Sequence, residues 1–333
     1  MKALVYLGPR RMELQDAPEP APAPGEVVIR SRASAICGSD LHGFREASPR
    51  RIPPLIMGHE TVGDVVAVGA GVDPARTGER VVLKPILACG ECARCLEGRI
   101  NLCASGRLVG RDLTGGFAEL FSVPASAAVP IAEDVPNDLA ALIEPVANAV
   151  HVTGRSIREG DDVLVIGAGP IGVLMVRGAV LAGARRAFSG DKVAARLKFA
   201  EGQGATPLDV DDPAADIAAR TDGAGVDVVI DAAGFESTWA LALQAVRAGG
   251  RIEAVGLGAS KGTVDFFAIA GKEVQITGSF AWTGADFGRA VQLIEAGRID
   301  PEGWFTHMPL AEGQRAFEEL VDGTDRFKVV LEP

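Results

Sequence analysis

The spacing of apolar positions changes near Asn137 and divides the chain into two regions with different patterns. Before this point, short runs of aliphatic residues occur at 2–6, 26–33, 62–68 and 80–83, separated by turns rich in glycine and proline. Short strand-like runs between such turns are typical of antiparallel sheets and barrels. The first region is therefore predicted to form a barrel-like β domain.

The second region alternates between strand-like and helix-like patterns. Apolar residues in 139–154 follow helical spacing, which predicts one helix there. Further along, strands are predicted at 163–166, 226–234, 249–257 and 273–280, with helices between them, the first of these at 170–184. This alternation favours a doubly wound parallel sheet covered by helices. The predicted fold class is thus α/β, with a β-barrel domain followed by a parallel-sheet domain.

The C-terminal segment predicts two amphipathic helices, 286–297 and 310–323, and a short strand within 327–333. These elements are too few to form a domain of their own, so we expect them to pack on the N-terminal barrel. The predicted domains are 1–145 together with 280–333, and 146–279 as an insertion between them.

The composition restricts the class of protein. The 333 residues exceed what one compact core usually holds, and 47% apolar with 23% charged residues is typical of a globular protein. A net charge of −11 disfavours nucleic acid or an anionic membrane as a partner. The chain has no apolar run long enough for a membrane span, and its N-terminal apolar run ends at Gly8. We therefore expect a cytoplasmic protein that acts on a small molecule.

A glycine-rich turn follows the predicted strand 163–166 and opens a helix. Its residues Gly167, Gly169, Pro170, Ile171 and Gly172 fit the G-x-G-x-x-G pattern in the strand-to-helix context that dinucleotide binding requires. The helix N-terminus offers free N–H groups to a pyrophosphate. The alternative is an ordinary glycine-rich turn.

Nineteen residues after Gly172 stands Asp191, close to the place where this fold carries an acid that binds the adenosine ribose. A carboxylate there would repel a 2′-phosphate, so NAD is favoured over NADP. Lys192 and Arg196 lie near enough in the sequence to accept a phosphate, and Arg196 is retained as a candidate cofactor-binding residue. Asp191 could instead be a simple helix cap.

Four cysteines crowd into the loop 89–103, at Cys89, Cys92, Cys95 and Cys103. Two-residue spacers allow neighbouring sulfurs to reach one Zn²⁺ at about 2.3 Å. Four thiolates would close the site to water, so a structural zinc is predicted. Unrelated thiols or a redox pair are the alternative.

A second set of possible ligands is scattered along the sequence. Cys37 and His59 are about 20 residues apart, and alone each would usually be a packing residue. Asp40 could orient the imidazole of His59. Glu144 places a charge in an apolar stretch, which favours a cation or an ion pair as its partner, although an exposed helix edge would also suit it.

These motifs together carry a resemblance to a known family. They are Cys37-Gly38-Ser39-Asp40, Gly58-His59-Glu60, the four-cysteine loop, Glu144-Pro145 and the turn 167–172. Along essentially its whole length the chain resembles the zinc-containing medium-chain alcohol and polyol dehydrogenases. The resemblance implies a GroES-like catalytic domain, a Rossmann NAD-binding domain, a cleft between them, and a homodimer or homotetramer.

The resemblance also implies roles for individual residues. Cys37 and His59 match the ligands of a catalytic zinc, and Glu60 matches a glutamate that exchanges with water as a ligand. Alcohol dehydrogenases have a further cysteine where this chain has Asn148, whereas polyol dehydrogenases have Glu-Pro, as at Glu144. The third ligand thus stays open between Glu60 and Glu144, and a polyol-like substrate is favoured.

Ser39 and His42 resemble the family's proton relay, and a turn hydroxyl and a surface histidine are the alternatives. The predicted reaction moves a hydride between NAD and a secondary alcohol, with a zinc that lowers the pKa of the bound alcohol. A polyol, a sugar phosphate, an aminocyclitol and a threonine-like amino alcohol all fit as substrates.

Three other functions compete with this prediction. One is an epimerase that retains its NAD, and another is a protein that binds NAD without catalysis. A zinc-free NADPH reductase is disfavoured, because it would lack Cys37, His59 and the cysteine loop.

The sequence leaves the roles of two further sets of side chains undecided. Arg45, Arg50 and Arg51 could bind an anionic substrate, but a solvated loop is favoured. The aromatic candidates for a pocket wall could equally be core residues; they are Phe44, Phe117, Phe280 and Trp282.

Overall fold

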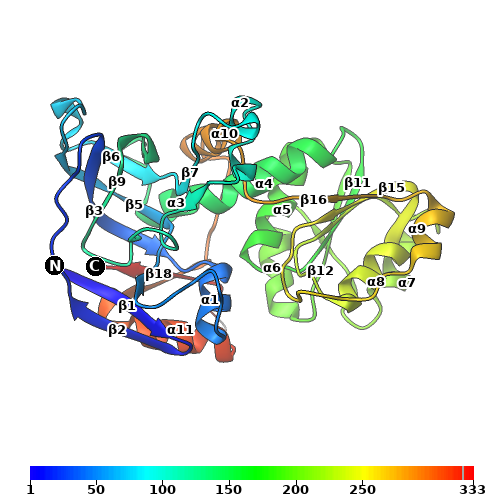
Figure 1. Ribbon diagram of the computed structural model, residues 1–333. Coiled ribbons are helices and arrows are strands. Elements are labelled where there is room, and N and C mark those ends of the chain that lie inside the picture. Colours follow the sequence, from blue (N-terminus) through cyan, green and yellow to red (C-terminus); the bar gives the residue numbers. More distant parts are fainter. Residues whose placement is uncertain (325) are drawn as a thin grey trace. The chain divides into compact units, whose positions relative to one another are not determined.

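The computed structural model describes residues 1–324 and 326–333, and internal contacts divide the chain into two compact units (Figure 1). Unit 1 comprises Met1–Glu144 and Thr283–Pro333, and unit 2 comprises Pro145–Trp282. The domain boundaries drawn from the sequence, after residues 145 and 279, stay predictions, because a division by contacts does not test which segment folds independently.

Unit 1 is built around a mixed sheet with the strand order β10-β6-β5-β3-β18-β17, and β9 also pairs with β3. A smaller sheet has the order β2-β1-β4, and β7 pairs with β8. The strands are β1 (Lys2–Gly8), β2 (Arg11–Asp16), β3 (Glu26–Ala35), β4 (Leu55–Ile56), β5 (Glu60–Val68), β6 (Arg80–Leu83), β7 (Ile86–Leu87), β8 (Arg107–Leu108), β9 (Leu120–Pro124), β10 (Ala128–Pro130), β17 (Phe305–Pro309) and β18 (Lys328–Glu332).

The helices of unit 1 are short and lie mostly between strands. They are α1 (Gly38–Arg45), α2 (Ala93–Leu96), α3 (Asn137–Ala141), α10 (Gly284–Glu295) and α11 (Gly313–Asp322), with single turns η1 (Pro74–Arg76), η2 (Ile100–Leu102), η3 (Ala125–Ala127) and η4 (Leu310–Glu312). The C-terminal strand β18 pairs antiparallel with β3, and Figure 1 shows it in red among the blue strands. The last segment of the chain thus completes the sheet that the first segment begins.

One hydrophobic core of unit 1 lies between the β1–β2 sheet and α11. Phe44 and Phe117 are fully buried there, and their rings lie 5.1 and 5.9 Å from that of Phe317. Both are therefore core residues, which decides a question that the sequence left open. In unit 2, Trp282 is fully buried as well, whereas Phe280 is exposed.

Unit 2 contains a parallel sheet with the order β13-β12-β11-β14-β15-β16. Its strands are β11 (Asp162–Ile166), β12 (Arg186–Gly190), β13 (Thr206–Pro207), β14 (Val226–Asp231), β15 (Val246–Ala254) and β16 (Gln275–Gly278). Its helices are α5 (Pro170–Leu181), α6 (Ala194–Gly202), α7 (Pro213–Arg220), α8 (Glu236–Ala245), α9 (Phe266–Lys272) and most of α4 (Ile143–Ser156). Strands are added to both sides of the first strand, β11, which is the doubly wound arrangement. The predicted fold class is confirmed.

The single helix predicted over 139–154 is wrong. The structure has α3 and α4 instead, with the break at Leu142. Pro145 explains the break, because a proline lacks the N–H for a helical hydrogen bond and its ring collides with the carbonyl four residues earlier. The first turn of α4 tolerates it. Among the described helices, none is both long and apolar enough to cross a membrane.

Candidate active site and metal loop

Strand register brings the first group of candidate ligands together. Ala35 at the end of β3 pairs with Glu60 at the start of β5. Cys37 lies two residues beyond this pair on one strand and His59 one residue before it on the other. Cys37 is also the N-cap residue that directly precedes α1. Two segments that are distant in sequence therefore converge at the end of the sheet.

One ion could contact all three side chains. The donor atoms of Cys37, His59 and Glu60 lie within 4.8 Å of one another. His59 is 4% exposed and Glu60 is 1% exposed. A thiolate, an imidazole and a carboxylate form a donor set that suits zinc with one open position. Glu144 lies outside this group of three, yet its charge reaches His59 and Lys328.

The site favours positive charge. Burial opposes protonation of His59, but the carboxylate of Asp40 and the thiolate of Cys37 outweigh it and raise its pKa to about 10. Likewise, burial opposes the charge of Lys328, and the anionic Glu60 and Cys37 raise its pKa. Residues that stabilise buried positive charge in this way also fit a divalent cation.

Each buried anion of the site has a fixed partner. The Oδ1 atom of Asp40 lies 3.5 Å from Nδ1 of His59, which leaves Nε2 as the ring nitrogen available to a metal. The Nζ atom of Lys328 lies 2.5 Å from Oε2 of Glu60 and also donates to the carbonyl of Ile36. Asp40 and Lys328 thus contact the candidate ligands His59 and Glu60 and restrict their movement.

The predicted relay residues lie on α1, beside Cys37. Ser39 is exposed, and its Oγ atom donates to the sulfur of Cys37 at 3.5 Å. His42 lies one turn further along, with a side chain that is 59% exposed. Both residues are thus exposed on the helix that follows Cys37.

The structure corrects the prediction that all three arginines near this helix lie in a solvated loop. Arg45 and Arg50 are exposed, but Arg51 is only 8% exposed and donates to Asp40 at 2.7 Å. The sequence pattern could not separate Arg50 from Arg51, because only the fold shows which of them faces the buried Asp40.

The cysteine loop gathers its four sulfurs without help from any other segment. The sulfur–sulfur distances are 3.5 Å for Cys92–Cys95, 3.6 Å for Cys89–Cys103, 3.8 Å for Cys89–Cys95 and 4.0 Å for Cys92–Cys103. Four sulfurs arranged tetrahedrally at about 2.3 Å from one zinc would be about 3.8 Å apart. The backbone N–H groups of Glu91 and Cys92 lower the pKa of Cys89 to about 6, which favours the thiolate.

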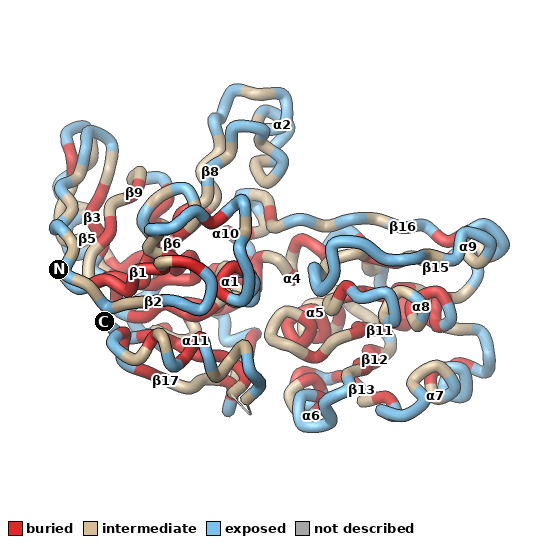
Figure 2. The backbone as a smooth tube through the Cα atoms, turned by 60° about the horizontal axis from the view of Figure 1, so that its bottom comes forward, coloured by how far each residue is buried: buried red, intermediate tan, exposed pale blue. Residues whose placement is uncertain are grey.

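The same loop has no apolar core. Between residues 86 and 108 no residue is buried, and Figure 2 shows the segment around α2 and β8 in the colours of exposed and intermediate residues. A segment without buried apolar contacts needs another source of stability. A zinc ion bound by the four thiolates would supply it.

The glycine turn of unit 2 has the backbone that its motif predicts. Gly167 has a φ of +96°, and α5 begins at Pro170 with Gly169 as the preceding cap. A Cβ atom on Gly172 would lie 1.7 Å from the carbonyl oxygen of Gly167, so no other residue fits there. A Cβ on Gly169 would meet nothing within 4 Å, which leaves space for a ligand next to the backbone.

Asp191 lies at this turn. Its Oδ2 atom accepts a hydrogen bond from the N–H of Ala168 at 2.7 Å, and its Oδ1 atom accepts one from Val193 at 2.8 Å. The carboxylate is therefore fixed beside the pyrophosphate-binding motif. Ile171 lies in the first turn of α5, and Arg196 is exposed on α6.

Family models match both parts of the chain. A model described as "Alcohol dehydrogenase GroES-like domain" matches residues 23–133, and one described as "Zinc-binding dehydrogenase" matches residues 170–296. The L-threonine 3-dehydrogenase of Thermococcus kodakarensis is 35% identical over 321 residues, which is 93% of this chain and 90% of that protein. The chain belongs to the zinc-binding alcohol dehydrogenase family.

Solved structures agree with this assignment. The 2R,3R-butanediol dehydrogenase of Bacillus subtilis has a TM-score of 0.91 and 28% identity, covering 100% of this chain and 99% of that one. An alcohol dehydrogenase of Escherichia coli CFT073 complexed with NADH has a TM-score of 0.93 and 32% identity, with the same coverage. The chain is thus an oxidoreductase that acts on CH–OH groups with zinc and a nicotinamide dinucleotide. The comparisons do not favour the epimerase or the non-catalytic alternative.

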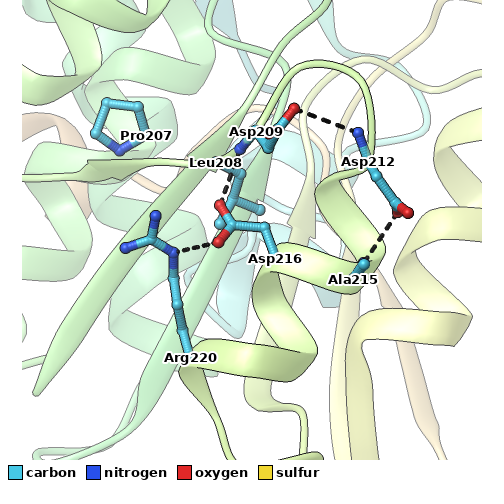
Figure 3. Close-up of a pocket in the computed structure, with 7 residues that line it drawn as sticks. All are labelled: Pro207, Leu208, Asp209, Asp212, Ala215, Asp216 and Arg220. Atoms are coloured by element: carbon cyan, nitrogen blue, oxygen red, sulfur yellow. Dashed lines mark hydrogen bonds and ion pairs between the residues drawn. The ribbon is translucent and has the colours of Figure 1, made fainter.

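A surface hollow of the dehydrogenase is unrelated to these residues. It has a volume of about 520 Å³ in unit 2 and is lined by Pro207, Leu208, Asp209, Asp212, Ala215, Asp216 and Arg220 (Figure 3). Asp216 pairs with Arg220 at 2.7 Å and accepts from the N–H of Asp209, while Asp212 caps α7. These carboxylates therefore stabilise the start and the surface of a helix.

Lys328 and the role of Arg51 were missed from the sequence. A signal for Lys328 existed, because it interrupts the apolar run of the last strand in the same way that Glu144 interrupts its helix. No comparable signal marks Arg51.

Proposed function

We propose that this dehydrogenase oxidises a secondary alcohol whose neighbouring carbon bears a second hydroxyl or an amino group, with NAD as the hydride acceptor. Polyols, sugar phosphates, aminocyclitols and threonine-like amino alcohols belong to this class. The observation that carries the proposal is the group of Cys37, His59 and Glu60, of which His59 and Glu60 are buried, with the charge of Glu144 nearby.

In this proposal, Cys37, His59 and one carboxylate hold a catalytic zinc, and Cys89, Cys92, Cys95 and Cys103 hold a structural one. When bound, the catalytic zinc supplies a Lewis acid that lowers the pKa of an alcohol oxygen. Glu60 is the carboxylate nearest to the other two donors, and its ion pair with Lys328 restrains it. Glu144 is the second candidate for the same position.

Two side chains of α1 transfer the proton that leaves the alcohol. Ser39 accepts it at Oγ while giving up its own hydroxyl hydrogen, and His42, exposed one turn further along, delivers a proton to solvent. A positioned acid–base pair of this kind contributes about 10²–10⁴-fold to a rate.

Two observations support a substituted substrate. The named relatives act on L-threonine and on 2R,3R-butanediol, which both carry a heteroatom next to a carbinol carbon. In addition, this chain offers two carboxylates, Glu60 and Glu144, where a neighbouring hydroxyl or ammonium group would find a hydrogen-bond acceptor.

The preference for NAD rests on Asp191. Its carboxylate is fixed by Ala168 and Val193 at the glycine turn. A negative charge at this place binds ribose hydroxyls and repels a 2′-phosphate. Gly167, Gly169, Pro170, Ile171 and Gly172 form the pyrophosphate site, and Arg196 is the residue that could weaken the preference.

The proposed assembly is a homodimer formed through unit 2. The strand β16 is the last in its sheet, and the exposed apolar side chains of Ile276, Phe266 and Phe267 lie on it and on α9. An open strand edge with apolar neighbours is a surface that a second copy can cover. If so, Phe267→Asp will yield monomers in light scattering, whereas Ile52→Asp, on an exposed residue of unit 1, will not. We further propose a cytoplasmic location, where thiolate ligands stay reduced.

The substrate class is tested by NAD reduction with matched alcohols. We expect kcat/KM for 2,3-butanediol, xylitol or L-threonine to exceed that for 2-butanol by at least about 10²-fold, because a site built to bind a polar group rejects analogues that lack it. The panel should also include a sugar phosphate and an aminocyclitol. Equal or better use of 2-butanol than of every substituted alcohol would overturn the proposal.

A further inference from the structure

Arg51 makes contacts that its neighbours in the sequence do not. One nitrogen of its guanidinium, Nη2, donates to Oδ1 of Asp40 at 2.7 Å and to Oγ of Ser39 at 3.1 Å. These two side chains have different surroundings, because Asp40 faces the candidate ligand His59, whereas Ser39 accepts the substrate's proton in the proposed function. The same cation thus contacts both the support of a ligand and the first residue of the relay.

The fold makes room for this buried arginine. Arg51 is 8% exposed and Asp40 is 0% exposed, so neither charge would be stable there without the other. A Cβ atom on Gly43 would lie 2.3 Å from Cδ of Arg51, so α1 has space for the side chain only because this residue is glycine. The turn before it is held by a hydrogen bond from the N–H of Arg51 to the carbonyl of Ser48.

The contacts define what the arginine does to each partner. Asp40 lies 3.5 Å from His59 and also accepts from the N–H of Cys37 at 3.4 Å. Arg51 fixes the orientation of this carboxylate, which is the ion-pair partner that faces Nδ1 of the imidazole. Because Ser39 accepts a hydrogen bond from Arg51, its own hydrogen points elsewhere, and it donates to the sulfur of Cys37 at 3.5 Å.

We propose that Arg51 is a positioning residue of the dehydrogenase, which couples the orientation of the zinc ligand His59, through Asp40, to the orientation of the relay hydroxyl of Ser39. The proposal rests on the proposed function, which makes His59 a zinc ligand and Ser39 the first residue of the relay. Arg51 acts through its partners and touches neither the substrate nor the cofactor in this account.

The test compares Arg51→Gln, Arg51→Lys and the matched control Arg50→Gln, all in the zinc-loaded enzyme. Zinc release to a coloured chelator is measured together with kcat and KM for 2,3-butanediol. For Arg51→Gln we expect zinc to leave the catalytic site about 10- to 100-fold faster and kcat to fall by a similar factor, with KM changed less than about threefold. Arg50→Gln, on an exposed side chain, should match the parent enzyme.

Arg51→Lys separates the two contacts. A lysine ammonium can pair with Asp40, but it lacks the planar fork that places a donor on Ser39 as well. We therefore expect zinc release near that of the parent enzyme and a kcat that stays at least about tenfold lower. In a Ser39→Ala background, Arg51→Lys should lower kcat no further, because the hydroxyl that it misplaces is gone.

The outcomes separate this proposal from the proposed function. If Cys37→Ala abolishes turnover while Arg51→Gln matches the parent in zinc release and kcat, only the role of Arg51 is overturned. Independent losses of kcat in Arg51→Lys and Ser39→Ala would overturn it too. Should Arg51→Gln fail to fold, Arg51→Lys and its Ser39→Ala combination still decide the question.

Discussion

The two proposed metal centres of this dehydrogenase are built in opposite ways. The cysteine loop takes all four donors from residues 89–103, and it contains no buried residue between 86 and 108. The group of Cys37, His59 and Glu60 is assembled from separate strands, and its ligands have buried partners in Asp40, Arg51 and Lys328. In the proposed function, the site that only stabilises a loop is local, whereas the site that performs chemistry is held by residues from several segments.

The comparison predicts that damage to the two centres will have different consequences. Loss of a ligand from the assembled group should remove activity and leave the fold intact, because its surroundings are packed. Loss of a ligand from the loop should weaken the fold and leave the chemistry intact.

The largest effect is expected for Cys37→Ala. Removing a ligand of the catalytic zinc should lower kcat by at least about 10³-fold, more than the 10- to 100-fold that follows the loss of an outer partner. NAD binding, measured by calorimetry, should change less than about threefold, since Gly167 and Asp191 lie in the other unit. Normal turnover in this variant would contradict the assignment of Cys37 to a catalytic zinc site that differs from the cysteine loop.

The second-largest effect is expected for the buried ion pair between Lys328 and Glu60. Lys328→Met leaves the carboxylate of Glu60, 1% exposed, without its cation, and should lower the free energy of unfolding by about 3–5 kcal/mol. The double variant Lys328→Met with Glu60→Gln should recover most of this loss in urea unfolding.

The control for that experiment is an exposed pair of similar length. Lys2 and Asp16 lie 2.8 Å apart with side chains that are 51% and 83% exposed, so Lys2→Met should cost less than about 1 kcal/mol. If Lys2→Met and Lys328→Met lowered the free energy of unfolding equally, burial of the Lys328–Glu60 pair would not increase its contribution to stability.

A smaller effect on stability is expected from the cysteine loop. Cys103→Ser removes one of four zinc ligands and should lower the melting temperature of unit 1 by several degrees, at about 2–4 °C for each kcal/mol lost in a unit of roughly 200 residues. Turnover per folded molecule should stay within about twofold of the parent. A loss of kcat as large as that of Cys37→Ala would contradict the assignment of this loop as structural.

The smallest effect concerns the choice of cofactor. Asp191→Ser should raise the ratio of kcat/KM for NADP to that for NAD by about tenfold, which is about 1.4 kcal/mol, because the charge that repels a 2′-phosphate is lost. Asp211→Ser, on an exposed residue of the same unit, is the control and should leave the ratio unchanged. An unchanged ratio in the Asp191 variant would count against its contact with the ribose.

What the sequence predicted follows the same division between local and assembled features. The cysteine spacing and the glycine turn are contiguous motifs, and strand β6 was predicted at 80–83, where the structure has Arg80–Leu83. Lys328, in contrast, donates to the carbonyl of Ile36, a contact that spans 292 residues. Arg51 differs from Arg50 only in the direction that the turn gives its side chain. Such contacts depend on the complete fold, so no local pattern reveals them.

The helix predicted at 139–154 failed for a related reason. Its apolar spacing is helical throughout, but Pro145 interrupts the backbone hydrogen bonds that the spacing presupposes. A pattern of side chains therefore predicts the buried face of a segment better than it predicts where the helix starts.

The central claim, that one chain holds two zinc ions in centres of different design, is tested most directly by counting zinc in the purified protein. Elemental analysis should give about two zinc ions per chain in the parent enzyme and about one in Cys37→Ala, with the cysteine loop still loaded. A parent enzyme with about one zinc per chain, lost in Cys103→Ser and unaffected by Cys37→Ala, would contradict the account.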